Sequence, residues 1–166
     1  FLIVPLSISF VSYFNYEEEI RPIEVVVLQP NVDPYNTKFD SSMLEQLEDM
    51  LALAKEKVTP ETDLVVAPET ALSYNIYEPN LKRTEIYNTL VEAKEAMNDV
   101  TLLWGAASVN QFSERRSSAS IQVKKDVFRE YYNSSLLIDS IDHPKFIHKS
   151  KLVPGVEKIP FVKYFP

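Results

Sequence analysis

The sequence contains no cysteine among its 166 residues. Disulfide bonds, thiolate metal sites and a cysteine nucleophile are therefore excluded within these residues. Glycine is also scarce, with two residues where an average chain of this length would have about 7%. Glycine-rich phosphate-binding loops cannot form, and we predict no cofactor. The histidines His143 and His148 make a poor metal site without a further histidine or cysteine, so we predict no metal and assign them no role.

The charge balance is acidic. Seventeen basic residues face 24 acidic ones, which gives a formal net charge of −7. A basic face of the kind that binds the phosphate backbone is missing, so nucleic acid is not expected as a partner. With 45% hydrophobic residues, the chain can bury one core of a single domain.

The first fourteen residues carry no charge, and acidic residues follow from Glu17. As a helix, this segment would span about 21 Å, which is less than the roughly 30 Å of a hydrocarbon core. Because the chain starts without methionine, we expect it to begin inside a longer gene product. We interpret residues 1–15 as the end of a transmembrane helix and 16–22 as a juxtamembrane linker whose acidic residues suit an extracytoplasmic flank. The alternative is a buried core strand or helix.

The remaining sequence alternates between strand and helix patterns. The run Ile23–Leu28 is apolar and β-branched, as expected of a strand buried on both faces. Ser42 and Glu45 form a capping box ahead of a helical pattern that Pro60 ends. The other expected elements are a strand at 64–67, a helix after Asn80, a strand at 100–108 and a hairpin of strands at 119–123 and 131–138. This order predicts an α/β fold with helices packed on a sheet.

Two charged positions are candidates for chemistry. Glu69 follows Pro68 directly after a buried strand, and ligand sites in α/β folds gather at the carboxyl ends of strands. Alternatively, Glu69 is an acid in the first turn of a following helix, favoured by the helix dipole. Lys149 lies in a basic stretch that is either a solvated face or the source of one fixed positive charge for an oxyanion. In an extended strand, Lys149 and Lys151 would share a face.

A third candidate is polar and uncharged. Asn133 precedes two serines at the start of an apolar strand. It begins an Asn-x-Ser glycosylation sequon, which matters only in a glycosylating secretory pathway. We interpret it instead as a strand start with a hydrogen-bonding amide.

Four ordered segments carry a resemblance to a known family. They are VVVLQPNVD at 25–33, VVAPETAL at 65–72, YNSSLLID at 132–139 and HKSKLVPGVEKIP at 148–160. Together they resemble the nitrilase-like domain of apolipoprotein N-acyltransferases, membrane enzymes of the nitrilase (carbon-nitrogen hydrolase) superfamily. The resemblance implies a partial nitrilase-like α-β-β-α sandwich, with residues 23–166 as the N-terminal part of the catalytic domain.

The resemblance also implies roles for individual residues. Glu69 matches the family's general base, Lys149 its catalytic lysine and Glu157 a second glutamate important for activity. Phe39, after Lys38, stands where the family often has a tryptophan that contacts substrate. The family's cysteine nucleophile is expected further along than Pro166, so we expect the isolated chain to be inactive in acyl transfer.

The implied reaction moves a fatty acyl group from a phospholipid, through a cysteine thioester, to the amine of a diacylglyceryl-cysteine lipoprotein. The implied location is the bacterial inner (cytoplasmic) membrane, with the nitrilase-like domain on the periplasmic side. Two alternatives remain open. One is a soluble nitrilase-family amidase with water as acceptor, and the other is a non-catalytic structural or partner-binding module.

Overall fold

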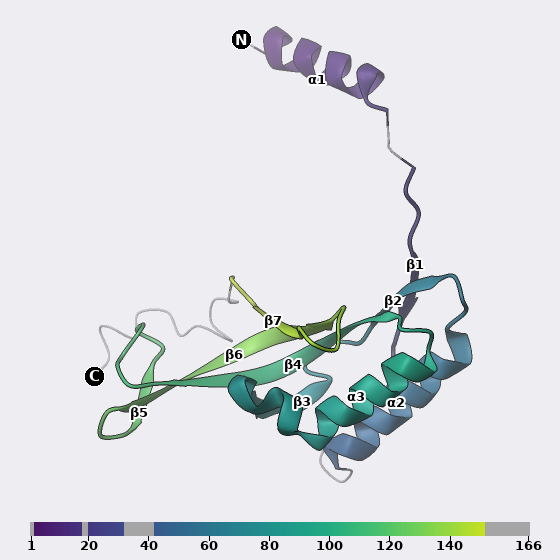
Figure 1. Ribbon diagram of the computed structural model, residues 1–166. Helices are drawn as coiled ribbons and strands as arrows, with labels where there is room; N and C mark the ends of the chain where they lie inside the picture. The colour runs from purple at the N-terminus through teal and green to yellow at the C-terminus, as the bar shows by residue number, and fades with distance from the viewer. Residues whose placement is uncertain (1, 18–19, 32–41, 152–166) are drawn as a thin grey trace.

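The computed structural model describes residues 2–17, 20–31 and 42–151, and these form a mixed α/β structure around one seven-stranded sheet. Figure 1 shows α2 and α3 side by side along the sheet, with α1 held apart from it. The elements in chain order are α1 (Ile3–Asn15), β1 (Glu24–Val27), α2 (Met43–Lys57), β2 (Thr62–Val66), β3 (Leu72–Tyr77), the 3-10 helix η1 (Glu78–Arg83), α3 (Glu85–Ala96), β4 (Thr101–Phe112), β5 (Ile121–Lys124), β6 (Val127–Ile138) and β7 (Lys145–His148).

The sheet combines parallel and antiparallel pairs. Strands β1, β2 and β4 run parallel, and β3 also pairs in parallel with β4. Strand β6 is antiparallel to β4, and both β5 and β7 are antiparallel to β6. Since two reversals restore the direction, β7 runs the same way as β2 and β4. The carboxyl ends of β2 and β7 therefore point toward the same end of the sheet.

The core lies between the sheet and the helices α2 and α3. The Ser42 capping box forms as predicted, with reciprocal bonds between Ser42 and Glu45, and α2 buries the apolar face that its spacing indicated. The buried apolar side chains from these two helices and the strands they cover are Leu47, Met50, Leu51, Ala54, Val65, Tyr87, Leu90, Ala93, Leu102, Trp104, Leu136 and Ile138. The predicted packing of helices on a sheet is confirmed.

Strand β1 differs from its prediction. None of its four residues is buried, and Val27 is 71% exposed, so the prediction of a strand buried on both faces is wrong. The reason is position. Among the described strands, β1 pairs with β2 alone, at the end of the sheet order, and the residue just after it, Leu28, is buried in the core. A β-branched run signals strand propensity, but not how many faces are covered.

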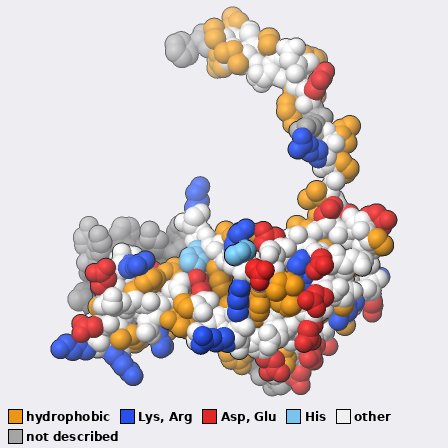
Figure 2. Space-filling view, in the orientation of Figure 1, with side chains coloured by type: hydrophobic (Ala, Val, Ile, Leu, Met, Phe, Trp, Pro, Cys, Tyr) orange, Lys and Arg blue, Asp and Glu red, His pale blue; other side chains and the backbone are white. Residues whose placement is uncertain are grey.

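The N-terminal helix α1 has 13 residues and none of them is buried, so the alternative of a buried core element is wrong for this segment. Figure 2 shows hydrophobic side chains along its surface. Within the three described ranges, no helix combines the length and apolar character needed to cross a membrane. The assignment of residues 1–15 to the end of a transmembrane helix stays a prediction, as do the boundaries of the other segments.

One helical layer and one sheet are visible in the described part of the chain. The second sheet and second helical layer of an α-β-β-α sandwich stay a prediction.

Candidate active site

Glu69 lies in a tight turn at the carboxyl end of β2. The turn is closed by a hydrogen bond from the Ala71 amide to the Pro68 carbonyl at 3.3 Å. Thr70 has a φ of 56°, a left-handed conformation that is uncommon for a β-branched residue. Strand β3 follows at Leu72, so the alternative that placed Glu69 in the first turn of a helix is wrong. The turn projects the carboxylate beyond the sheet.

Gly105 on β4 lets this turn lie directly against the sheet. A Cβ atom at Gly105 would stand 2.1 Å from the Pro68 carbonyl oxygen, 2.7 Å from the Glu69 Cα and 2.8 Å from the Thr70 amide nitrogen. All three are backbone atoms, which cannot turn aside as a flexible side chain can. Because Gly105 has no side chain, the turn packs directly on β4, and this contact sets the distance between the Glu69 backbone and β4.

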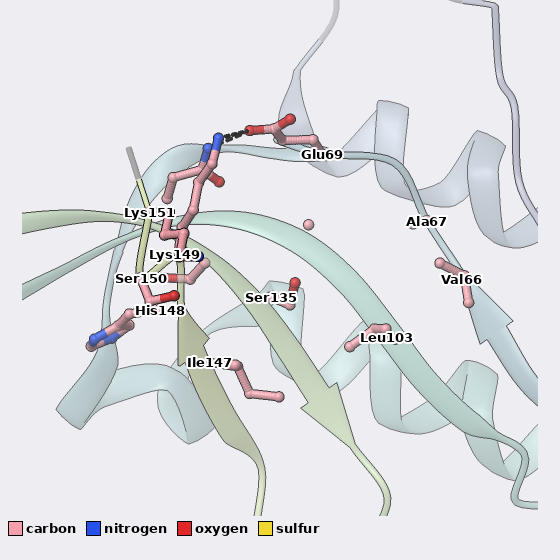
Figure 3. A pocket seen from close by; sticks show the side chains of 13 residues that line it. Val66, Ala67, Glu69, Leu103, Ser135, Ile147, His148, Lys149, Ser150 and Lys151 are labelled. Carbon is pink, nitrogen blue, oxygen red and sulfur yellow. Dashed lines mark hydrogen bonds and ion pairs between the residues drawn. The ribbon is translucent and has the colours of Figure 1, made fainter. Parts of the chain in front are cut away.

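Lys149 follows the last residue of β7 and continues its pairing with β6. The Lys149 amide donates to the Asn133 carbonyl at 2.8 Å. Because β7 and β2 run in the same direction, Lys149 and Glu69 emerge at the same end of the sheet. The Lys149 Nζ lies 3.3 Å from Glu69 Oε1, so the ammonium and the carboxylate form an ion pair (Figure 3). Strand β7 ends at His148. Lys149 and Lys151 both follow the strand, so they do not share a strand face as predicted.

Asn133 joins these two residues. Its side-chain amide donates to Glu69 Oε1, while its carbonyl accepts from the Lys149 backbone. Strand β6 begins at Val127, so the prediction that Asn133 starts a strand is wrong, and its link to Glu69 was not predicted. The available signal was alternation. On β6, Asn133 and Ser135 point to the face opposite the core residue Leu136, which is the face that carries Glu69.

These groups border an open pocket of about 540 Å³. Its apolar part is formed by Val66, Leu103 and Ile147 on three different strands, and Gly105 lies beneath the Glu69 turn. Lys149 is 31% exposed and Glu69 62%, so solvent reaches both charges. A carboxylate here can accept a proton, and the ammonium 3.3 Å away can stabilise a negative charge that forms nearby. The amide of Asn133 holds the carboxylate in place.

The other predicted site residues, Glu157 and Phe39, lie outside the described residues. In the described ranges, no three His, Cys, Asp or Glu side chains gather in a group that could hold a metal ion. His148, for which no role was predicted, contacts two other side chains. Its ring lies against Tyr132 and its Nε2 contacts Glu78 on the opposite face of the sheet.

The geometry defines an α/β chain with a carboxylate, an ammonium and an amide at one end of a sheet. No protein-family model matches the chain. An apolipoprotein N-acyltransferase from Chlorobaculum tepidum is 26% identical over 152 residues, which cover 87% of this chain and 27% of that relative. The chain thus spans about a quarter of the relative's length. It is distantly similar to an acyltransferase, and the similarity covers the turn with Glu69 as part of a nearly chain-long match.

Proposed function

We propose that the protein is an acyltransferase that moves a fatty acyl group from a phospholipid to the N-terminal amine of a diacylglyceryl-cysteine lipoprotein. The observation that carries the proposal is the Glu69–Lys149 pair, 3.3 Å apart at the edge of an open pocket. The distant similarity to an apolipoprotein N-acyltransferase supports the same assignment.

In this proposal each residue has a defined task. Glu69 accepts the proton of a cysteine thiol and gives it to the alkoxide of the departing lysophospholipid as the thioester forms. It then accepts a proton from the attacking amine and returns it to the cysteine thiolate that leaves. Lys149 places its ammonium beside the oxyanion of the tetrahedral intermediate. Asn133 orients the Glu69 carboxylate through its amide. The proposal requires a cysteine from a part of the protein outside these 166 residues, because they contain none.

Several parts of the proposal rest on the family resemblance alone. We propose Glu157 as a supporting carboxylate and Phe39 as a substrate contact. We also propose that residues 1–15 end a transmembrane helix and that the protein works at the bacterial inner membrane, with this domain on the periplasmic side. Phospholipid and lipoprotein are then its two partners.

The test uses the complete gene product that contains this chain. Glu69→Gln and Lys149→Met should each lower acyl transfer by at least about 100-fold, the usual contribution of a general base or an oxyanion-stabilising group. Glu61→Gln and Lys145→Met are matched controls, since both side chains are exposed and neither lines the pocket with Glu69. Mass spectrometry of the lipoprotein N-terminus measures the transferred acyl group.

Two results would count against the proposal. Transfer within twofold of wild type in the Glu69→Gln variant would remove the base. Release of free fatty acid or ammonia, with no acylated amine, would instead identify a hydrolase that uses water as acceptor.

A further inference from the structure

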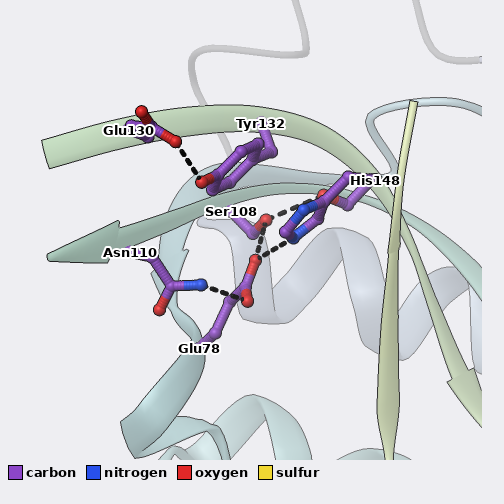
Figure 4. A network of polar contacts seen from close by, with 7 residues as sticks. Glu78, Ser108, Asn110, Glu130, Tyr132 and His148 are labelled. Atoms are coloured by element: carbon purple, nitrogen blue, oxygen red, sulfur yellow. Dashed lines mark hydrogen bonds and ion pairs between the residues drawn. The ribbon is translucent and has the colours of Figure 1, made fainter. Parts of the chain in front are cut away.

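A second polar cluster lies on the helix-covered side of the same strands, centred on Glu78 (Figure 4). Glu78 Oε1 accepts hydrogen bonds from Ser108 Oγ at 2.7 Å and from His148 Nε2 at 2.6 Å. Glu78 Oε2 accepts from Asn110 Nδ2 at 2.5 Å. The Glu78 side chain is only 14% exposed. A carboxylate with three donors is held in one orientation, and it ties η1 to β4 and β7.

The His148 ring is held from a second direction. It stacks on Tyr132, with ring centroids 3.8 Å apart and an angle of 5° between the planes. The Tyr132 hydroxyl donates to Glu130 Oε2 at 2.7 Å. Burial, followed by this hydrogen bond, raises the pKa of the Tyr132 phenol above its usual range, so the phenol stays neutral and keeps its donor. The face of the imidazole is thus held by the Tyr132 ring and its edge by the Nε2 contact with Glu78.

Alternation connects this cluster to the candidate active site. Ser134 faces His148 across the β6–β7 ladder, and Ser134 Oγ lies 2.8 Å from Ser108 Oγ in the cluster. The chain neighbours of this pair, Asn133 before Ser134 and Lys149 after His148, belong to the opposite face and contact Glu69. The residues that anchor one face are therefore direct chain neighbours of those that form the site on the other.

Strand β7 needs such an anchor because it is short. It has four residues, three of them exposed, and Lys149 is the first residue after it. A short edge strand frays readily at its end unless side chains hold it. His148 is the last residue of the strand, so its contacts act where fraying would begin and set the starting point of the Lys149 side chain.

We propose that His148 and Glu78 are positioning residues that hold the end of β7 so that the Lys149 ammonium meets the Glu69 carboxylate. Their mutual hydrogen bond lies on the face of the sheet opposite the Glu69–Lys149 pair. The inference concerns the site of the proposed acyltransferase, but its geometry can be tested without any acyl transfer.

The test is competitive amine labelling of the chain, with acetic anhydride as the reagent and mass spectrometry to follow each lysine across a range of pH. His148→Phe keeps a ring for Tyr132 but removes the donor to Glu78. We expect it to raise the labelling rate of Lys149 by about two- to fivefold, the effect of releasing a partly exposed ion pair. His148→Gln retains an N–H donor and should show less than half of that rise. Lys57, at the end of α2, should not change in either variant.

The other histidine provides the matched control, since His143→Phe alters an exposed ring in the loop that precedes β7. Glu78→Gln is a second route to the same loss if His148→Phe fails to fold, and it should also raise Lys149 labelling. Wild-type labelling of Lys149 in folded His148→Phe or Glu78→Gln protein would overturn the proposal, and so would an equal rise in His143→Phe. If Lys149 labelling rises as expected but the complete gene product transfers no acyl group, the proposed function is rejected and this inference still holds.

Discussion

Gly105→Ala is the smallest change that should disturb the candidate site. The new methyl group would stand 2.1 Å from the Pro68 carbonyl oxygen, whereas ordinary van der Waals contact begins near 3.4 Å. The turn must therefore recede by about 1.3 Å, and the Glu69 Cα, only 2.7 Å from the same methyl, must move with it. Forcing a methyl group into a packed position costs about 1–3 kcal/mol of folding free energy.

The same movement should open the pair of charges. A recession that adds about 1 Å to the separation takes Glu69 Oε1 from 3.3 Å to more than 4 Å from the Lys149 Nζ, beyond the range of an ion pair. Circular dichroism should show a melting temperature lower by about 2–12 °C, given about 2–4 °C per kcal/mol for a chain of this size. Competitive labelling of Lys149 should rise in the same sample.

Ala107→Ser provides the control, because it adds one heavy atom two residues further along β4, at a residue that already carries a Cβ atom. It should change the melting temperature by less than Gly105→Ala does. If Gly105→Ala melts within 1 °C of wild type and leaves Lys149 labelling unchanged, the idea that Gly105 sets the height of Glu69 is wrong.

Two further predictions concern stability. Hydrogen bonds from Ser117 and Ser120 lower the pKa of the Glu130 carboxyl below its usual range, so this group stabilises the fold fully above its unfolded pKa of about 4.3 and loses that contribution as pH falls through its lower folded value. Glu130→Gln should therefore weaken the acid dependence of the melting temperature below about pH 5, and an unchanged acid slope would contradict this. Lys94 is buried and donates to two backbone carbonyls just after α3, so Lys94→Met should cost about 1–3 kcal/mol in urea unfolding. The exposed Lys57→Met should cost less than about 0.5 kcal/mol of unfolding free energy. An equal loss in both variants would mean that the hydrogen bonds of Lys94 to the two carbonyls do not stabilise the fold.

The fold was predictable wherever a local pattern decided it. The Ser42 capping box and the apolar spacing behind it located α2, and the charged residues between two strand patterns located the β5–β6 hairpin. The strand β3 was missed because its sequence mixes polar and apolar residues and the pattern gave no run. β7 is four residues long, too short for periodicity to resolve.

The site was predictable to a different extent. The position of Glu69 after a buried strand came from the sequence pattern, and the family resemblance assigned Glu69 and Lys149 to one catalytic site, with which their 3.3 Å contact agrees. The role of Gly105 was not predictable, because it depends on which residue of β4 lies beneath the turn. Asn133 and His148 depend in the same way on the β6–β7 register, which no local sequence pattern reveals.

Register also explains how a residue on the covered side of the sheet can matter to a site on the other. A pleated strand passes side chains alternately to its two faces, so a fixed His148 constrains the backbone that carries Lys149. The constraint acts along β7, and it extends to β6 through the hydrogen bond from the Lys149 amide to the Asn133 carbonyl. A substitution that removes the Glu78 contacts should therefore displace Lys149 and Asn133 more than the Glu69 backbone, which the turn over Gly105 holds. Both supports act on one ion pair between Lys149 and Glu69, which can be lost only once, so a double variant that removes both supports should raise Lys149 labelling little more than the stronger single variant does.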